Sequence, residues 1–298
     1  MSEMKLGFSI LSHKKPDLIF KQLLLKLNCF SNKVIAIHHD FNQAPFNNEL
    51  LINESIQVVK EYVRTYWSHT NNIKAIMDTF KLLYEANCDW YITLSANCYP
   101  IKPASYIQNF LSDTNYDGFV NMHSIWTDKL EYFKYFRKAF STKYMFRVPY
   151  LNRDLGLKYR SFRISRAPED VLFTETFIPY HGSDWFIINK KSMKYLLDNE
   201  KTINSMVAFF KKINSGPDLN VCPPEVIFQS ILGNSDLHLS NNYYRFIDWI
   251  NSTNFHPNTL TLKHWKYIQN SDALFARKFD SQQSRELIDL INNEILNQ

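Results

Sequence analysis

Hydrophobic and polar positions in the first 125 residues alternate between two periods. Short, almost continuous apolar runs predict five buried strands, at 5–12, 33–38, 55–59, 90–95 and 118–122. Apolar residues at helical spacing predict three helices between them, at 16–28, 72–86 and 102–111. Strands separated by helices of this length predict an α/β fold with a largely parallel sheet.

The second half of the chain has a less regular pattern. Residues 126–180 have no clear period, which predicts a functional insertion or an irregular segment. Order returns at 181–188, where a turn leads into a strand. Helices are predicted near 191–197, 203–213 and 224–232, the last with proline early and an acid in its first turn. Because no repeat or linker interrupts the chain, we expect a single domain over 1–298.

Composition narrows the classes of site that we expect. The chain has 15% aromatic residues, which predicts a large aromatic core, with rings that face a ligand as the alternative. Only 6 glycines are present, and neither glycine-rich phosphate-loop motif occurs. The spacing of Cys29, Cys88, Cys98 and Cys222 fits neither a zinc site nor a disulfide framework, which indicates a reducing compartment.

The formal net charge of +5 suits an anionic ligand or a membrane surface and is too small to indicate nucleic acid by itself. Much of it lies in residues 137–166, which contain nine Lys or Arg and one acid. This segment predicts a solvated face, a contact with anionic lipid, or a surface for a phosphate-bearing acceptor. RNA binding by 131–166 is a rival hypothesis. With no run of 18 apolar residues, we expect a cytoplasmic protein, peripheral at most to the inner face of the membrane.

Polar clusters follow three of the predicted strands. They are Ser-His at 12–13, His-His-Asp at 38–40 and Ser-Ala-Asn at 95–97. In parallel sheets ligands bind beyond the carboxyl ends of the strands, so these clusters predict one site. Asp40 suits a ribose hydroxyl or a base N–H, or is a simple turn residue. His38 and His39 should point to opposite faces of their strand, which argues against a zinc site.

The last quarter carries an acid and a pair of cations. Glu225 follows a Pro-Pro corner, and Arg277 and Lys278 lie inside an apolar frame. A carboxylate can deprotonate a hydroxyl group, and adjacent cations can hold phosphate oxygens, with Arg able to bind them bidentately. No Asp-x-Asp motif is present to hold a metal ion for the same purpose.

Together these blocks resemble glycosyltransferase family 14, which contains the core-2/I-branching N-acetylglucosaminyltransferases and the peptide O-xylosyltransferases. The His-His-Asp at 38–40 resembles the family's His-Val-Asp, and 90–100 resembles a strand that ends in Leu-Ser-Gly-x-Asp-Tyr-Pro. Gly-Ser-Asp-Trp-Phe at 182–186 and Phe-Ala-Arg-Lys-Phe at 275–279 are the most specific later blocks. Blocks at 223–229 and 245–249 and the His-Pro pair at 256–257 complete the match. The blocks follow the family order over most of the chain, and 182–186 is closer to the xylosyltransferase branch.

The resemblance implies a GT-A type fold, with a Rossmann-like, mostly parallel central sheet flanked by helices. It also implies inverting, metal-independent transfer from a UDP-sugar (UDP-GlcNAc, UDP-xylose or a related donor) to a hydroxyl group of a glycan or glycolipid acceptor, which fits surface-polysaccharide synthesis. Residues 1–125 would then form the nucleotide-sugar-binding half and 126–298 the acceptor-binding and catalytic half. Neither a metal nor another cofactor is expected, and no nucleic acid partner.

Site residues follow from the same resemblance. Glu225 resembles the catalytic base of the core-2 branch and Asp184 the acid of the xylosyltransferase branch, and the choice between them stays open. The expected donor-binding residues are His13, Asp40, Trp67, Ser95, Asn97, Arg277 and Lys278. The expected acceptor-binding residues are Trp185 and Trp249, for which core packing is the alternative. Cys98 replaces the family's Asp, which leaves the donor sugar open. A non-catalytic nucleotide- or carbohydrate-binding module on the same fold is the alternative function.

Overall fold

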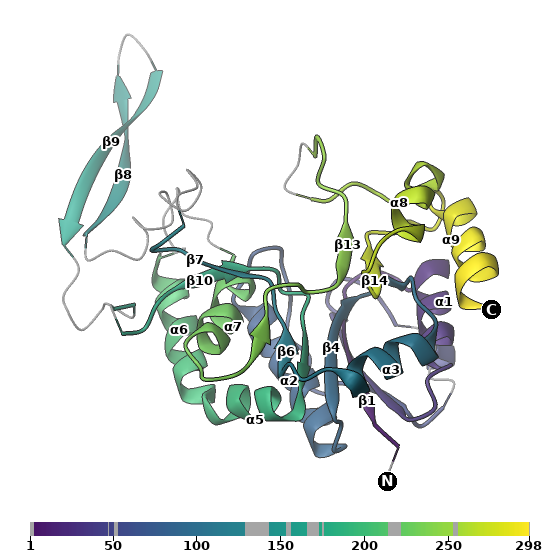
Figure 1. Cartoon of the computed structure of the whole chain (residues 1–298). Coiled ribbons are helices and arrows are strands. Elements are labelled where there is room, and N and C mark those ends of the chain that lie inside the picture. The colour runs from purple at the N-terminus through teal and green to yellow at the C-terminus, as the bar shows by residue number, and fades with distance from the viewer. Residues whose placement is uncertain are drawn as a thin grey trace.

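A seven-stranded sheet forms the centre of the computed structural model (Figure 1), in the order β12-β6-β11-β4-β1-β2-β3. The strands are β1 (Leu6–Ser12), β2 (Lys33–His39), β3 (Ile56–Val58), β4 (Trp90–Ser95), β6 (Gly118–Phe119), β11 (Ile187–Asn189) and β12 (Leu239–Ser240). Strand β11 runs antiparallel to its two neighbours, and the other pairings are parallel. The predicted α/β class and mostly parallel sheet are therefore confirmed. The structure describes residues 3–46, 48–50, 53–128, 143–152, 156–165, 173–174, 176–213, 222–252 and 256–297.

Helices cover both faces of this sheet. They are α1 (Leu18–Leu27), α2 (Asn71–Glu85), α3 (Ala104–Asp113), α5 (Lys190–Asp198), α6 (Glu200–Ile213), α7 (Pro224–Gly233), α8 (Trp265–Gln269) and α9 (Arg285–Ile291). Short 3₁₀ turns lie at Asn48–Leu50 and Leu262–His264, and a π-turn lies at Asn292–Leu296. Helices α1, α3, α8 and α9 lie on one side, and α5, α6 and α7 lie on the other (Figure 1).

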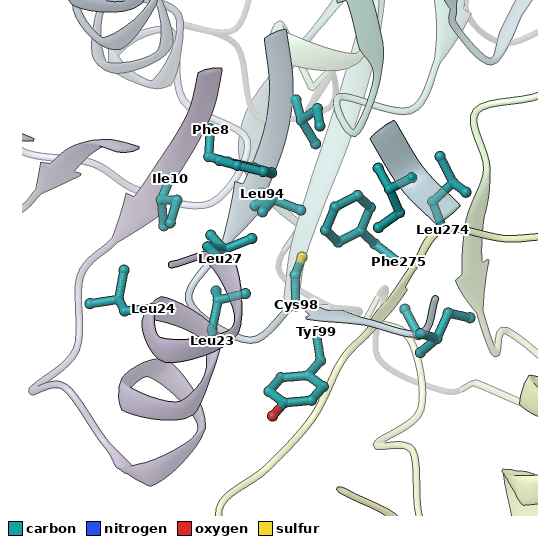
Figure 2. Packing of buried hydrophobic residues seen from close by; sticks show 14 of the residues in the cluster. Phe8, Ile10, Leu23, Leu24, Leu27, Leu94, Cys98, Tyr99, Leu274 and Phe275 are labelled. Carbon is teal, nitrogen blue, oxygen red and sulfur yellow. The ribbon is translucent and has the colours of Figure 1, made fainter. Parts of the chain in front are cut away.

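Alternation along the strands divides the core in two. In β2, Ile35 and Ile37 belong to the cluster under α1, α3 and α9, while Val34 and Ala36 belong to the cluster under α2, α5, α6 and α7. This is the period of two expected for a sheet buried on both faces. Figure 2 shows the first cluster, where Phe8 and Leu94 of the sheet pack near Phe275.

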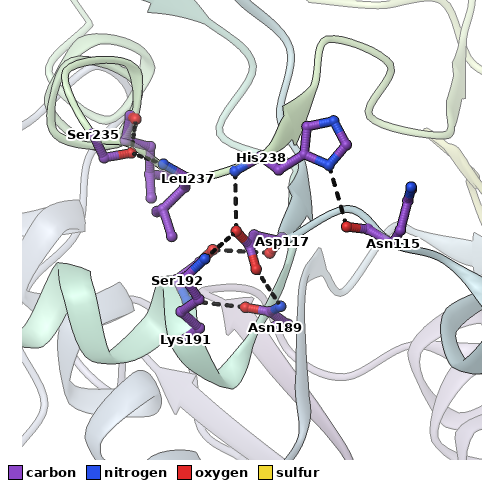
Figure 3. A network of polar contacts seen from close by, with 9 residues as sticks. Asn115, Asp117, Asn189, Lys191, Ser192, Ser235, Leu237 and His238 are labelled. Carbon is purple, nitrogen blue, oxygen red and sulfur yellow. Dashed lines mark hydrogen bonds and ion pairs between the residues drawn. The ribbon is translucent and has the colours of Figure 1, made fainter.

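A carboxylate fixes one edge of the sheet at its amino end (Figure 3). Asp117 accepts hydrogen bonds from the side chains of Asn189 (3.0 Å) and Lys191 (2.7 Å) and from the backbone N–H of His238 (3.0 Å). These bonds connect the start of β6 with β11, α5 and the approach to β12. They lower the pKa of Asp117 against the effect of burial, which alone would raise it.

Two smaller sheets, β10-β7 and β13-β14-β5, were not predicted from the sequence. The apolar run 118–122 does not form one strand, because β7 (Met122–Ser124) leaves the central sheet to pair with β10 (Tyr180–Gly182). A run of apolar residues cannot reveal such a change of partner. The other small sheet joins β13 (Arg245–Ile247), β14 (Phe275–Arg277) and β5 (Tyr99–Pro100), and it carries Arg277 toward the end of β4.

Part of 126–180, the segment expected to be a functional insertion or irregular, forms regular strands. Strands β8 (Lys143–Asn152) and β9 (Gly156–Ser165) form an antiparallel hairpin, drawn apart from the central sheet in Figure 1. Its strands mix aromatic, basic and apolar residues without a clean alternation, which explains why the pattern did not reveal it. Residues 137–142, 153–155 and 166 of the basic segment lie outside the described residues, so its contact with a membrane stays a prediction. In the described part of the chain, no helix has the length and apolar character needed to cross a membrane.

Candidate active site

Helix α7 and strand β10 form the wall that carries the two candidate carboxylates. Pro224 starts α7, which places Glu225 in the first turn. From the same helix, Gln229 Nε2 donates to the Ser183 carbonyl (2.7 Å), and the Ser230 hydroxyl accepts from the Tyr180 N–H (3.0 Å). These bonds hold the segment 180–184 against the helix, so Asp184 and Glu225 share one rigid support.

Strand β4 fixes Asp184 from the other side. The Thr93 hydroxyl lies 3.0 Å from the Asp184 carbonyl oxygen and accepts from the Phe186 N–H at 2.7 Å. Burial of the Asp184 carboxyl group and the nearby charge of Glu225 raise its pKa from 3.8 to about 7, and Arg277 acts in the opposite direction. The negative charge of Glu225 therefore disfavours ionisation of Asp184, as expected for like charges in one site.

The raised pKa gives a stability prediction for Asp184→Asn. Between about pH 4 and 7 the folded protein binds a proton that the unfolded chain releases, so the free energy of unfolding falls as the pH rises. We expect Asp184→Asn to raise the Tm at pH 8 by several degrees. Each kcal/mol gained in the free energy of unfolding raises the Tm by about 2–4 °C. Thermal unfolding at pH 8 and pH 5 measures the difference, which should be larger at pH 8. An equal or lower Tm at pH 8 contradicts a buried, proton-favouring Asp184.

Glu225 is the more accessible of the two carboxylates. Its side chain is 37% exposed, and its Oε2 lies 3.3 Å from Nε2 of His181 on β10. His181 is not among the residues that the sequence predicted. Its position in the His-Gly-Ser-Asp block was visible, but only the packing of α7 on β10 reveals the contact.

A group of basic side chains lies near these carboxylates, with Arg277 interacting with Asp184. The Arg277 guanidinium lies over the Trp185 ring, 4.3 Å from its centroid, and its Nε has no hydrogen-bond partner among the described residues. The pKa of Lys278 is lowered by burial and then by the charges of Arg277 and Lys14. Burial, followed by the charges of Lys278, Arg277 and Lys14, lowers the pKa of His256. Such a concentration of donors and positive charge favours a polyanionic ligand.

Lys14 was missed by the sequence reasoning, and His256 was noticed only as part of the His-Pro pair in the family match, with no role in the site. Lys14 directly follows the Ser-His cluster at the end of β1, so the strand-end argument could have included it. His256 comes from a distant loop and has no local signal that would place it beside Lys278.

In the structure Asp40 contacts its own loop, whereas the sequence predicted that it would bind a nucleoside. Its buried carboxylate accepts hydrogen bonds from the Thr65 N–H (2.7 Å), the Gln43 amide (2.6 Å) and Asn42. Burial alone would raise the pKa of Asp40, but these bonds outweigh it and lower the pKa to about 2. Asp40 therefore anchors the loop that leads to Trp67, and its contact with a nucleoside stays a prediction.

Two of the predicted tryptophans are exposed rather than packed in the core. Trp67 is 58% exposed and Trp249 is 51% exposed. The Trp67 ring contacts the His256 ring at a centroid distance of 6.0 Å, so it lies beside the cation cluster. Trp185 supports Arg277, as described above, and a contact of its ring with an acceptor stays a prediction.

The remaining predicted residues lie at the ends of β1 and β4. His13 is exposed. The Asn97 amide donates to the Phe279 carbonyl (3.0 Å), which connects the turn after β4 to the residue that follows Lys278. The Ser95 hydroxyl lies 3.3 Å from Cys98 Sγ. Asn97 therefore ties the turn after β4 to the segment that carries Arg277 and Lys278.

Cys98 is fully buried. It interacts electrostatically with Arg245, whose pKa is lowered by burial to about 10 and whose Nε has no partner among the described residues. The Arg245 side chain donates to the Thr93 carbonyl at 3.2 Å.

The described residues bring no group of three or more His, Cys, Asp or Glu side chains together as metal ligands. His38 and His39 diverge, as their strand position predicts. His38 Nε2 accepts from the Val63 N–H (3.0 Å), whereas His39 lies between the Ser12 hydroxyl (3.1 Å) and the Ala44 carbonyl (2.8 Å).

Comparison with known proteins gives a consistent result. The family model for "Branch: Core-2/I-Branching enzyme" matches residues 8–273. The chain is similar to the Beta-glucuronosyltransferase GlcAT14A of Arabidopsis thaliana (26% identity over 220 residues, 71% of this chain and 44% of that protein). It is also similar to Xylosyltransferase 1 of Mus musculus (23% over 259 residues, 79% and 24%) and to Xylosyltransferase oxt of Drosophila melanogaster (22% over 289 residues, 86% and 30%). The chain thus spans less than half the length of these three relatives.

One solved structure was also compared, a 4-diphosphocytidyl-2C-methyl-D-erythritol synthase from Anaerococcus prevotii. It aligns over 78% of this chain and 85% of that chain at 9% identity, with a TM-score of 0.30. This likeness is too weak to bear on function.

Proposed function

The chain belongs to the core-2/I-branching enzyme family of glycosyltransferases, and from this membership we propose that it is an inverting, metal-independent transferase of GT-A type. It moves a sugar from a UDP-sugar to a hydroxyl group of a glycan or glycolipid acceptor. The observation that supports this most strongly is the Asp184–Glu225 carboxyl pair, whose charges interact with each other and with Arg277.

The proposed chemistry is a single in-line displacement at the anomeric carbon. The acceptor oxygen bonds to that carbon while its proton passes to a carboxylate, and the bond from the carbon to the diphosphate oxygen breaks with its electron pair. We assign the proton to Glu225, since its side chain is the more exposed. Asp184, with its raised pKa, holds a proton over more of the neutral range and can donate a hydrogen bond to a sugar hydroxyl.

The departing diphosphate carries negative charge, which the nearby cations stabilise. Arg277 and Lys278 supply fixed positive charge, with Lys14 and His256 beside them. Preorganised cations at a developing charge are among the larger contributions to catalysis. This arrangement supports transfer without a metal ion.

The relatives provide a set of candidate donors and acceptors. The names of the relatives indicate xylosyl and glucuronosyl transfer, so UDP-xylose and UDP-glucuronic acid join UDP-GlcNAc as candidate donors. We propose a glycan or lipid-linked glycan acceptor in surface-polysaccharide synthesis, with the protein in the cytoplasm and residues 137–166 in peripheral contact with the membrane.

A donor panel tests this function directly. The pure protein is incubated with each of the three donors, with UDP-glucose and UDP-galactose for comparison, and UDP release is measured with and without EDTA. We expect release from at least one donor and no loss with EDTA. UDP binding without turnover of any donor, with glycan acceptors present, would favour the binding-module alternative.

A further inference from the structure

We propose that His181 is a positioning residue for Glu225. Its imidazole holds one carboxylate oxygen, so that the other is directed to the acceptor hydroxyl group. This inference rests on the proposed function, because it takes Glu225 as the base.

The contact itself is well defined. His181 Nε2 lies 3.3 Å from Glu225 Oε2, and the His181 side chain is only 14% exposed while that of Glu225 is 37% exposed. The contact has the distance of an ion pair without the geometry of a formed hydrogen bond, and the described part of the chain gives the Glu225 carboxylate no further ion pair or hydrogen bond. The histidine is thus the more buried partner of the pair.

The backbone of β10 leaves the imidazole little freedom. On one side of His181, the Tyr180 N–H donates to the Ser230 hydroxyl of α7. On the other side, a Cβ on Gly182 would lie 1.8 Å from the Asn121 carbonyl oxygen, so the strand approaches its partner too closely for any side chain there. The position of His181 relative to α7 is therefore fixed by both neighbours.

Other ionisable groups lie around the pair. His123 is opposite His181 on β7, and its Nδ1 lies 3.8 Å from Asp128 Oδ2. Asp184 interacts with Glu225 from the turn after β10. His123 is 44% exposed and is turned toward its own acid, so it offers a matched control for a histidine that has no role in holding Glu225.

The chemistry determines which atom carries the proton. An ionised carboxylate can only accept hydrogen bonds, so Nε2 carries the hydrogen that faces Oε2. A slight turn of either side chain completes this hydrogen bond, which then fixes the rotation of the carboxylate and leaves Oε1 for the acceptor. Without it, Glu225 can turn in the open part of the site, and a displacement of about 1 Å can reduce a rate by about 10²-fold.

The test compares His181→Ala with His181→Gln and His123→Ala in steady-state transfer assays. We expect His181→Ala to lower kcat by about 10–100-fold, with the donor KM and UDP affinity within about twofold of the wild type. The amide N–H of His181→Gln should restore part of kcat, and His123→Ala should retain it. Wild-type kcat in His181→Ala, or no recovery in His181→Gln, overturns the proposal.

A double-mutant cycle separates this proposal from the function on which it rests. Residues that act as a unit are not additive, so His181→Ala should lower the residual rate of Glu225→Gln no further. If Glu225→Gln retains activity, the assignment of the base fails. If Glu225→Gln is inactive while His181→Ala is fully active, the base stands and only the role of His181 is rejected.

Discussion

Glu225→Gln should lower the transfer rate by about 10²–10⁴-fold, the range for a general base. The amide keeps the size of the side chain and its place in the first turn of α7, but it cannot accept the proton of the acceptor hydroxyl. Since Glu225 is partly exposed and does not belong to the core, we expect the Tm and the affinity for UDP to change little. Steady-state transfer, thermal unfolding and UDP titration measure these three quantities.

A matched control exists in the same chain. Glu286 lies in the first turn of α9 and is exposed, so Glu286→Gln alters the charge near a helix N-terminus without altering the site. It should retain wild-type turnover. Wild-type turnover in Glu225→Gln would remove Glu225 from the chemistry and direct attention to Asp184.

Arg277→Ala should have the second large effect, a loss of about 10²–10³-fold in kcat, as for removal of one donor to a developing charge. Arg277 combines an Nε that has no partner among the described residues with a guanidinium that lies over the Trp185 ring. Arg277→Lys should recover only part of the rate, because an ammonium group lacks the planar fork that binds two phosphate oxygens. Transfer assays with saturating donor measure the effect.

The control for this change is Arg285→Ala, an exposed arginine at the start of α9. It removes the same charge from the protein and should leave turnover unchanged. If Arg277→Ala turns over at the wild-type rate, the cations do not replace a metal ion. Rescue of an inactive Arg277→Ala by Mn²⁺ or Mg²⁺ would instead show that the missing quantity is positive charge.

The sequence predicted the parts of the fold that depend on local periodicity. The continuous apolar runs of β1, β2 and β4 can be satisfied only by a sheet buried on both faces, and the structure places them together at its centre. The division of 118–124 between β6 and β7 and the β8–β9 hairpin were not predicted. Both depend on which strand is the partner, and local periodicity carries no information about that.

The candidate site shows the same division. Asp184, Glu225 and Arg277 stood out as residues in recognisable blocks, and the structure brings their charges together. The contact of His181 with Glu225 arises only when α7 packs on β10. Asp40 was visible as an acid after a strand, but its hydrogen bond from the Thr65 N–H, 25 residues further along the chain, was not.

The stereochemistry of transfer tests the central claim most directly. A single displacement driven by a carboxylate base inverts the anomeric carbon, and cations in place of a metal ion make the reaction independent of divalent ions. The measurement is the NMR spectrum of the glycoside formed from an α-linked UDP-sugar in the presence of EDTA. A β-linked product is the predicted result, whereas an α-linked product, or transfer that stops with EDTA and returns with a divalent metal ion, would contradict the account.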